Sequence, residues 1–160
     1  MDYDAARSRA RKAEAGLALA EPVSLASIQL HLEQQRDPKI VIKPIEGATD
    51  KVCGLWVGLD HTDLILHARA ASEVHRQQIV LHEFAHMILR HEQDIVSAED
   101  AGTFFPDLDP ERVVRALKRT DFLNDFEVTA ELLADRLAAR IRSSQDRSGG
   151  QPGNFSAVFG

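Results

Sequence analysis

The stretch "IVLHEFAHMILRHE", residues 79–92, is apolar on almost every side, yet it carries His82, Glu83 and His86. A buried polar group is costly unless a partner satisfies its hydrogen bonds. Residues four apart lie on the same face of a helix, so His82 and His86 direct two imidazoles toward one point. This is the H-E-x-x-H pattern, in which two histidines bind a metal and the glutamate acts as a base. Neutral imidazole suits zinc, which would satisfy the buried nitrogens.

A catalytic zinc site usually has three protein ligands, so a third must be found. His91 lies five residues after His86, about 500° round the helix, and is expected off the metal face. We expect it to make a helix-end contact or to support a ligand from outside. The metzincin pattern is excluded because Leu89 and Glu92 stand where it needs a glycine and a third histidine.

The third ligand is expected on a later helix, "NDFEVTAELLADRLAARI", about 40 residues downstream of His86. Glu127, Glu131 and Asp135 recur there every four residues and share one face. A different face is apolar and expected to be buried: Leu132, Leu133, Leu137 and Ile141. We expect Glu127 to be the ligand and Glu131 to accept the free ring N–H of a ligand histidine. Glu131 as the ligand, an Asn124–Glu127 capping pair, and a solvent-facing stripe are the alternatives.

The rest of the chain predicts an α+β fold in one domain, residues 1–142. Periodicity and caps predict two N-terminal helices within 5–36, one over 5–20 and one over 24–36 with Ser24 as its cap. A sheet is predicted within 39–68, with a strand at 39–44 followed by a hairpin of 54–60 and 63–68. After the sheet, the pattern predicts an active-site helix over 72–90 capped by Ser72, and helices over 110–119 and 124–142. The acidic residues 92–111 are expected to form a solvated loop with short helical turns. Residues 143–160 are rich in Gly, Ser and Pro and are expected to be a disordered tail.

Composition restricts the classes of function. The chain has 160 residues, 44% hydrophobic and 28% charged, as in ordinary globular domains. A net charge of −6 argues against direct nucleic-acid binding. The single cysteine, Cys53, excludes a disulfide framework and is expected to be a buried apolar residue. We find neither an export signal nor an apolar run of about 20 residues, so we expect a cytoplasmic protein without membrane contact.

The two segments "VHRQQIVLHEFAHMILRHE" and "FEVTAELLADRLA" together resemble the ImmA/IrrE family of bacterial metallopeptidases. The resemblance covers about residues 40–142. It implies a small zincin-like domain in which a short mixed or antiparallel sheet packs on the H-E-x-x-H helix. In this gluzincin-like plan His82, His86 and Glu127 bind Zn²⁺ and Glu83 is the catalytic base. Two departures are Phe84-Ala85, where Leu-Gly is common, and Glu131, where Asn is common.

The expected function is zinc-dependent hydrolysis of a peptide bond in a protein substrate. Glu83 would take a proton from water and pass it to the leaving amine. The oxyanion donor is open among four candidates: His67, His75, His91 and Arg119. The strand "LWVGLD" is expected to offer an exposed sheet edge to an extended substrate, with Trp56 in the core.

The resemblance also implies a regulatory role, in which the enzyme cleaves or relieves a helix-turn-helix transcriptional repressor. The alternative is a metal-binding regulatory or toxin-component module that acts by protein binding without proteolysis. The intact Glu83 favours the enzyme, because a binding module does not need a base. A third reading, an interaction protein without a metal, requires protein partners for both helix histidines.

Overall fold

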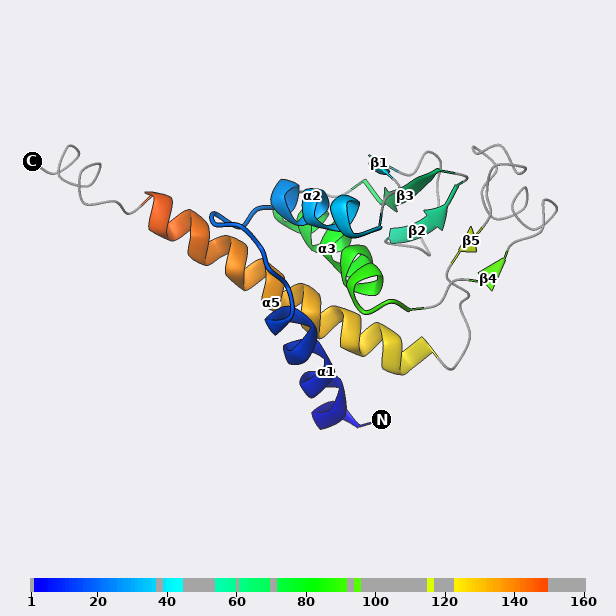
Figure 1. The fold of residues 1–160 in the computed structure, drawn as a ribbon, viewed down its shortest axis with the longest axis horizontal. Coiled ribbons are helices and arrows are strands. Elements are labelled where there is room, and N and C mark those ends of the chain that lie inside the picture. The colour runs from blue at the N-terminus through cyan, green and yellow to red at the C-terminus, as the bar shows by residue number, and fades with distance from the viewer. Residues whose placement is uncertain are drawn as a thin grey trace, which may run out of the picture.

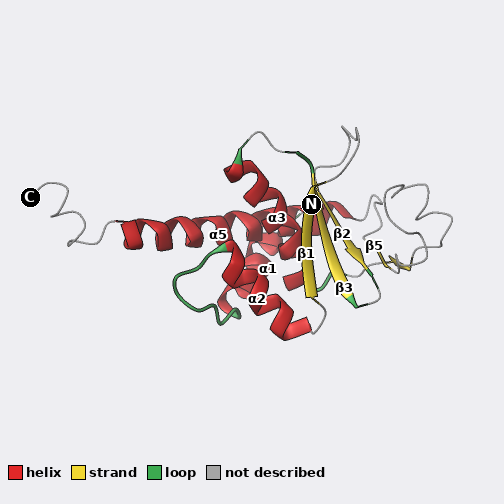
Figure 2. Ribbon diagram, turned by 90° about the horizontal axis from the view of Figure 1, so that it is seen from above, coloured by secondary structure: helices red, strands yellow, loops and turns green. Residues whose placement is uncertain are grey.

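The computed structural model describes residues 2–36, 39–44, 54–59, 61–69, 72–91, 94–95, 115–116 and 123–149. The elements in chain order are α1 (Tyr3–Ala15), α2 (Leu25–Arg36), β1 (Lys39–Pro44), β2 (Gly54–Gly58), β3 (Thr62–His67), α3 (Glu73–Ile88), β4 (Asp94–Ile95), β5 (Arg115–Ala116) and α5 (Leu123–Gly149). The predicted α+β class is confirmed. The helices gather on one side of the molecule and the sheet on the other (Figures 1 and 2).

The sheet is mixed and has the strand order β1-β3-β2-β5-β4. The predicted hairpin is confirmed, because β2 and β3 are antiparallel neighbours, whereas β1 runs parallel to β3. The expectation that β2 forms a free sheet edge is wrong. Val57 and Gly58 of β2 pair with β5, so β2 lies inside the sheet.

Helix α3 lies between the sheet and α5, and it contributes Val80, Leu81, Phe84, Ala85 and Met87 to the hydrophobic core. It begins after Ser72, whose hydroxyl accepts the backbone N–H of His75 at 3.1 Å, as the sequence predicts. Its second half is buried on several faces at once because the sheet, α2 and α5 all contact it. Its buried residues are Ile79, Val80, Leu81, Glu83, Phe84, Ala85, His86 and Met87.

Helices α1 and α2 cover this core. Ser24 caps α2 as predicted: its hydroxyl accepts the N–H of Ser27, and the Ser27 hydroxyl accepts the N–H of Ser24. Helix α1 packs on α5 through Ala6 and Ala10, which are fully buried. It ends at Ala15 rather than near residue 20, because Gly16 caps it and the chain leaves the helix there.

Two predictions near the C-terminus are wrong. Residues 143–149 belong to α5 and are not a disordered tail, because Ser144 and Arg147 bind the loop before α2. The Ser144 hydroxyl accepts the N–H of Val23 at 2.9 Å, and Arg147 pairs with Glu21 at 2.9 Å. The predicted helix over 110–119 is contradicted at Arg115–Ala116, which form β5.

Parts of several predictions fall on residues outside the described ranges. Cys53, residues 150–160, Arg119 and most of the acidic segment 92–111 lie outside the described residues; within that segment, Asp94–Ile95 form β4. In the described part of the chain, no helix combines the length and the apolar character needed to cross a membrane.

Candidate metal centre

Three side chains from α3 and α5 converge on one point between the two helices. His82 and His86 lie one turn apart on α3, and their Nε2 atoms are 3.2 Å apart. Glu127, in the first turns of α5, places its two carboxylate oxygens 2.8 Å from His82 Nε2 and 3.3 Å from His86 Nε2. The three residues form a group that could hold a metal ion. Glu127 is thus engaged with the histidines, and Asn124 lies inside the helix rather than at its cap.

The spacing of the donor atoms fits a small divalent cation. Ligand atoms about 2.0–2.1 Å from a tetrahedral zinc lie roughly 3.3–3.4 Å from one another. The two Nε2 atoms are 3.2 Å apart, and Glu127 approaches them with different oxygens, Oε2 at 2.8 Å from His82 and Oε1 at 3.3 Å from His86. One donor atom from each residue lies within 4.8 Å of the other two, so small side-chain adjustments bring them to the spacing of a zinc site. Two nitrogens and one carboxylate are also the donor set that zinc enzymes use. The residues present therefore fit zinc.

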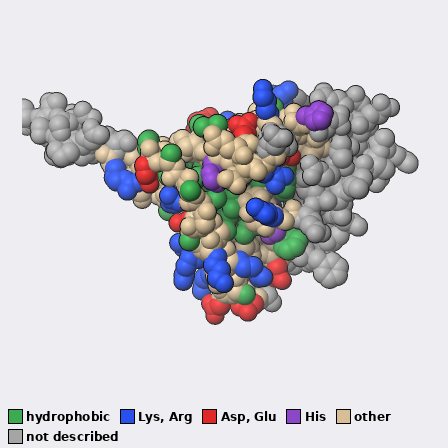
Figure 3. All heavy atoms as spheres, viewed as in Figure 1, with side chains coloured by type: hydrophobic (Ala, Val, Ile, Leu, Met, Phe, Trp, Pro, Cys, Tyr) green, Lys and Arg blue, Asp and Glu red, His purple; other side chains and the backbone are tan. Residues whose placement is uncertain are grey.

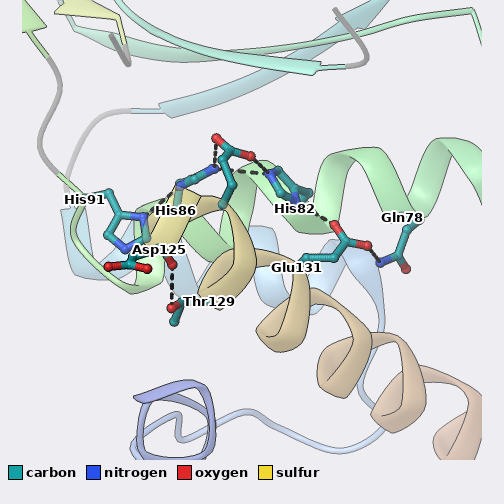
Figure 4. A network of polar contacts seen from close by, with 8 residues as sticks. Gln78, His82, His86, His91, Asp125, Thr129 and Glu131 are labelled. Atoms are coloured by element: carbon teal, nitrogen blue, oxygen red, sulfur yellow. Dashed lines mark hydrogen bonds and ion pairs between the residues drawn. The ribbon is translucent and has the colours of Figure 1, made fainter. Parts of the chain in front are cut away.

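The outer nitrogen of each imidazole has its own partner. His82 Nδ1 lies 2.7 Å from Glu131 Oε2, and because a carboxylate only accepts, Nδ1 must carry the proton. His86 Nδ1 lies 2.8 Å from His91 Nδ1. If His86 donates this hydrogen bond, its Nε2 lone pair is free for a metal. His82 Nε2 lies 2.8 Å from a Glu127 oxygen and by the same argument carries a proton, which a metal would have to displace. Figure 4 shows Glu131 and His91 on the outer sides of His82 and His86. The partner role expected for Glu131 agrees with this placement.

His91 reaches His86 because α3 ends in a Schellman turn. The N–H of His91 bonds the carbonyl of His86, and the N–H of Arg90 bonds that of Met87. Arg90 takes the required left-handed conformation, with φ of 57°. The chain therefore folds back over the last turn, and the His91 ring stacks on Phe126 of α5 at 4.1 Å. His91 is not one of the three residues of the candidate metal group, but its ring contacts one of them, His86, from the helix end.

The electrostatic potential is negative at the centre of the site, because the carboxylates of Glu127 and Glu131 both face His82. Burial alone lowers the pKa of His82, but the hydrogen bonds to Glu127 and Glu131 outweigh it and raise the pKa to about 10. Burial alone raises the pKa of Glu127, but the hydrogen bonds from His82 and His86 hold it well below its usual range. Burial, together with the charge of His86, lowers the pKa of His91 to about 4, which keeps it neutral and able to accept from His86. The two carboxylates stabilise positive charge at this site, whether it is carried by the His82 imidazolium or by a metal cation.

Gln78 extends the network by one more residue, and the sequence analysis did not identify it. Its side-chain amide donates to Glu131 Oε1 at 3.1 Å and to Asp135 Oδ1 at 2.9 Å. Figure 4 shows Gln78 on the side of Glu131 away from His82. The spacing of Gln78, His82 and His86, four residues apart each time, was a signal that could have revealed it. Gln78 fixes the carboxylate that fixes His82.

Glu83 is turned about 100° from His82 round α3, and its carboxylate lies toward β2 of the sheet. It is 5% exposed, and a Cβ built on Gly54 would lie 3.0 Å from its Oε1 and 2.8 Å from Ile79 Cγ2. Gly54 therefore allows α3 to approach β2 more closely than a side chain would permit. The position of Gly54 is explained by close packing against the H-E-x-x-H helix.

Of the four candidates for stabilising the oxyanion, His67, His75 and His91 lie in the described residues. His67 is paired in register with Gly54 and is buried, with Nδ1 3.0 Å from the carbonyl of Ala68. His75 is exposed in the first turn of α3, about two turns from His82.

Trp56 is a core residue, as predicted, and is 2% exposed. Its indole N–H donates to the buried carboxylate of Asp63 at 3.1 Å.

Comparison of the chain with protein-family models, with curated proteins and with solved structures gives no match. The class of site is therefore defined by its own geometry: a group of two histidines and one glutamate that could hold a metal ion.

Proposed function

We propose that the chain is a zinc-dependent endopeptidase with a zincin-like arrangement, in which His82, His86 and Glu127 hold the metal. The convergence of their three donor atoms is the observation that carries the proposal. The bonds from Glu131 and His91 support it, because they hold each imidazole with Nε2 toward the centre. Zinc bound there would polarise the scissile carbonyl and acidify a water molecule.

The chain's own contribution to the reaction is proton transfer and orientation. Glu83 accepts the proton of the attacking water at its carboxylate and returns it to the leaving amine. Glu131 and His91 keep the ligand imidazoles from rotating. From the ImmA/IrrE resemblance we further propose a protein substrate, in particular a helix-turn-helix repressor, and a regulatory role in the bacterial cytoplasm.

One observation favours the alternative, a metal-binding regulatory or toxin-component module without proteolysis. Glu83 is almost fully buried, whereas a working base must reach a water molecule. Under this alternative Glu83 serves packing against β2, and the metal only holds α3 and α5 together.

Replacement of Glu83 by Gln distinguishes the two functions. Gln keeps the size and most hydrogen bonds of Glu but cannot take up a proton at neutral pH. The matched control is Glu73→Gln, the same change on the same helix at a side chain that is 89% exposed. Each zinc-loaded protein is incubated with a bacterial lysate, and new protein N-termini are counted by chemical labelling and mass spectrometry.

The enzyme predicts new N-termini with the wild type and with Glu73→Gln. It predicts a loss of at least about 100-fold with Glu83→Gln, the usual scale of general-base removal. Metal content and melting temperature of Glu83→Gln must stay near those of the wild type for this reading. If folded, zinc-loaded wild type produces no new N-termini, the binding module replaces the enzyme.

A further inference from the structure

A second concave site lies on the face that carries α1 and α2. It is a cavity of about 860 Å³ between the C-terminal end of α1, helix α2 and the C-terminal end of α3. Figure 3 looks onto this face, where hydrophobic side chains lie recessed among Lys and Arg side chains. A volume of this order is ordinary for a small-molecule site, about 300–1,000 Å³.

The lining combines an apolar floor with a cationic rim. Leu17, Leu32, Met87 and Ile88 supply the apolar part. The cationic lining side chains are Lys12, Arg36 and Arg90, and His31 and His91 add two imidazoles, of which that of His91 is neutral. No described residue that lines the cavity is acidic, although the whole chain has a net charge of −6. The cavity lining is therefore positively charged, although the chain as a whole is negatively charged.

The cationic side chains of the rim differ in whether they already form an ion pair within the described residues. Arg36 is engaged, because its guanidinium bonds Asp63 at 3.4 Å and lies 4.9 Å from the centre of the Trp56 ring. Lys12 and Arg90 form no ion pair with any residue in the described ranges. Both are exposed at the mouth of the cavity. Two cations above apolar side chains suit a ligand with an anionic head and an apolar body.

We propose that this cavity binds a small amphipathic organic anion, with its carboxylate or phosphate at Lys12 and Arg90 and its apolar part on the floor. The proposal does not depend on the metal or on peptidase activity, since the cavity has no ligand residue in its lining. It has one link to the metal centre: His91 lines the cavity and also holds His86. A bound anion would thus contact the residue that supports a metal ligand, which is a route for regulation.

The test uses three probes that share a ten-carbon chain and differ in the head group: decanoate, decanol and decyltrimethylammonium. Each is titrated calorimetrically into the full-length, metal-free chain, below its micelle concentration and at low salt. Decanoate should bind at one site per chain and at least about tenfold more tightly than the other two. Equal binding of all three probes would mean apolar association only and would overturn the proposal, as would failure of decanoate to saturate.

A pair of variants locates the site. Lys12→Glu should weaken decanoate binding about fivefold or more, since an exposed ion pair contributes on this scale and the new charge repels the head group. Arg11→Glu is the matched control: it makes the same charge change on the preceding residue of α1, which is exposed and outside the cavity lining. Binding to Arg11→Glu should stay within about twofold of the wild type. Equal losses in the two variants would show that net charge, rather than the cavity, attracts the probe, and would overturn the proposal.

Discussion

Replacement of Glu131 by Gln tests whether this residue supports a ligand or is itself the ligand. Its carboxylate lies 2.7 Å from His82 Nδ1, on the side away from Glu127. Loss of such an outer partner typically weakens metal binding about 10–100-fold, which is about 1.4–2.8 kcal/mol. The Glu131 side chain is 51% exposed, so water screens its charge and the lower part of the range applies. We expect roughly 10–30-fold weaker zinc binding.

Two further variants, Glu127→Gln and Asp135→Asn, serve as comparisons for the loss of zinc affinity in Glu131→Gln. Glu127→Gln removes the charge of the proposed third ligand and should cost more than the outer-partner range, at least about 100-fold. Asp135→Asn changes the next acidic residue of the same stripe, whose carboxylate accepts from Gln78 at 2.9 Å. Zinc binding by this variant should stay within about threefold of the wild type, because its effect is indirect and screened.

The assay is competition for zinc with a chromophoric chelator at fixed pH and ionic strength. The predicted order of loss is Glu127→Gln, then Glu131→Gln, then Asp135→Asn. A larger loss from Glu131→Gln than from Glu127→Gln would mean that Glu131 is the ligand. Equal losses from Glu131→Gln and Asp135→Asn would show a general charge effect and would refute the specific bond to His82.

Three other predictions concern packing, the end of α5 and pH. Gly54→Ala should destabilise the fold by about 1–3 kcal/mol in denaturant titration, because the new Cβ would lie 2.8 Å from a side chain of α3; Gly16→Ala, with nothing nearer than 3.5 Å, should not. Ser144→Ala should cost about 1–2 kcal/mol, since it leaves the buried N–H of Val23 without its acceptor; an unchanged melting temperature would contradict the docking of this helix end. Zinc affinity should fall as the pH is lowered, because the ligand imidazoles must be neutral. Because the pKa of His82 is about 10 in the metal-free chain, zinc binding at pH 7 should release about one proton. Calorimetry in two buffers of different ionisation enthalpy measures this release, and its absence would contradict the raised pKa of His82.

Much of the site could be predicted because it depends on local spacing. The interval from His82 to His86 fixes two imidazoles on one helix face, and the interval from Glu127 to Glu131 places two carboxylates one turn apart. The structure brings these four residues together as the pattern indicates. Strand β1 and the β2–β3 hairpin were also predictable, because β-branched runs lie between turn residues.

The features that the sequence did not reveal depend on distant partners. Arg115 and Ala116 lie in a segment of good helix formers, yet they form a strand because β2, far upstream, supplies the hydrogen bonds. Residues 143–149 have a weak helical pattern, and α5 continues through them because Ser144 and Arg147 find partners in the loop before α2. His91 returns to His86 through a left-handed Arg90, which no helical projection anticipates.

The most direct test of the metal centre is zinc X-ray absorption spectroscopy on the protein loaded with one equivalent of zinc. The account predicts tight binding of one zinc per chain in a four-coordinate site of nitrogen and oxygen donors at about 2.0–2.1 Å. The multiple-scattering signal should correspond to two imidazoles, and it should fall to one in His82→Ala. Failure to bind one equivalent, a six-coordinate zinc, or an imidazole signal unchanged by His82→Ala would contradict a centre built from His82, His86 and Glu127.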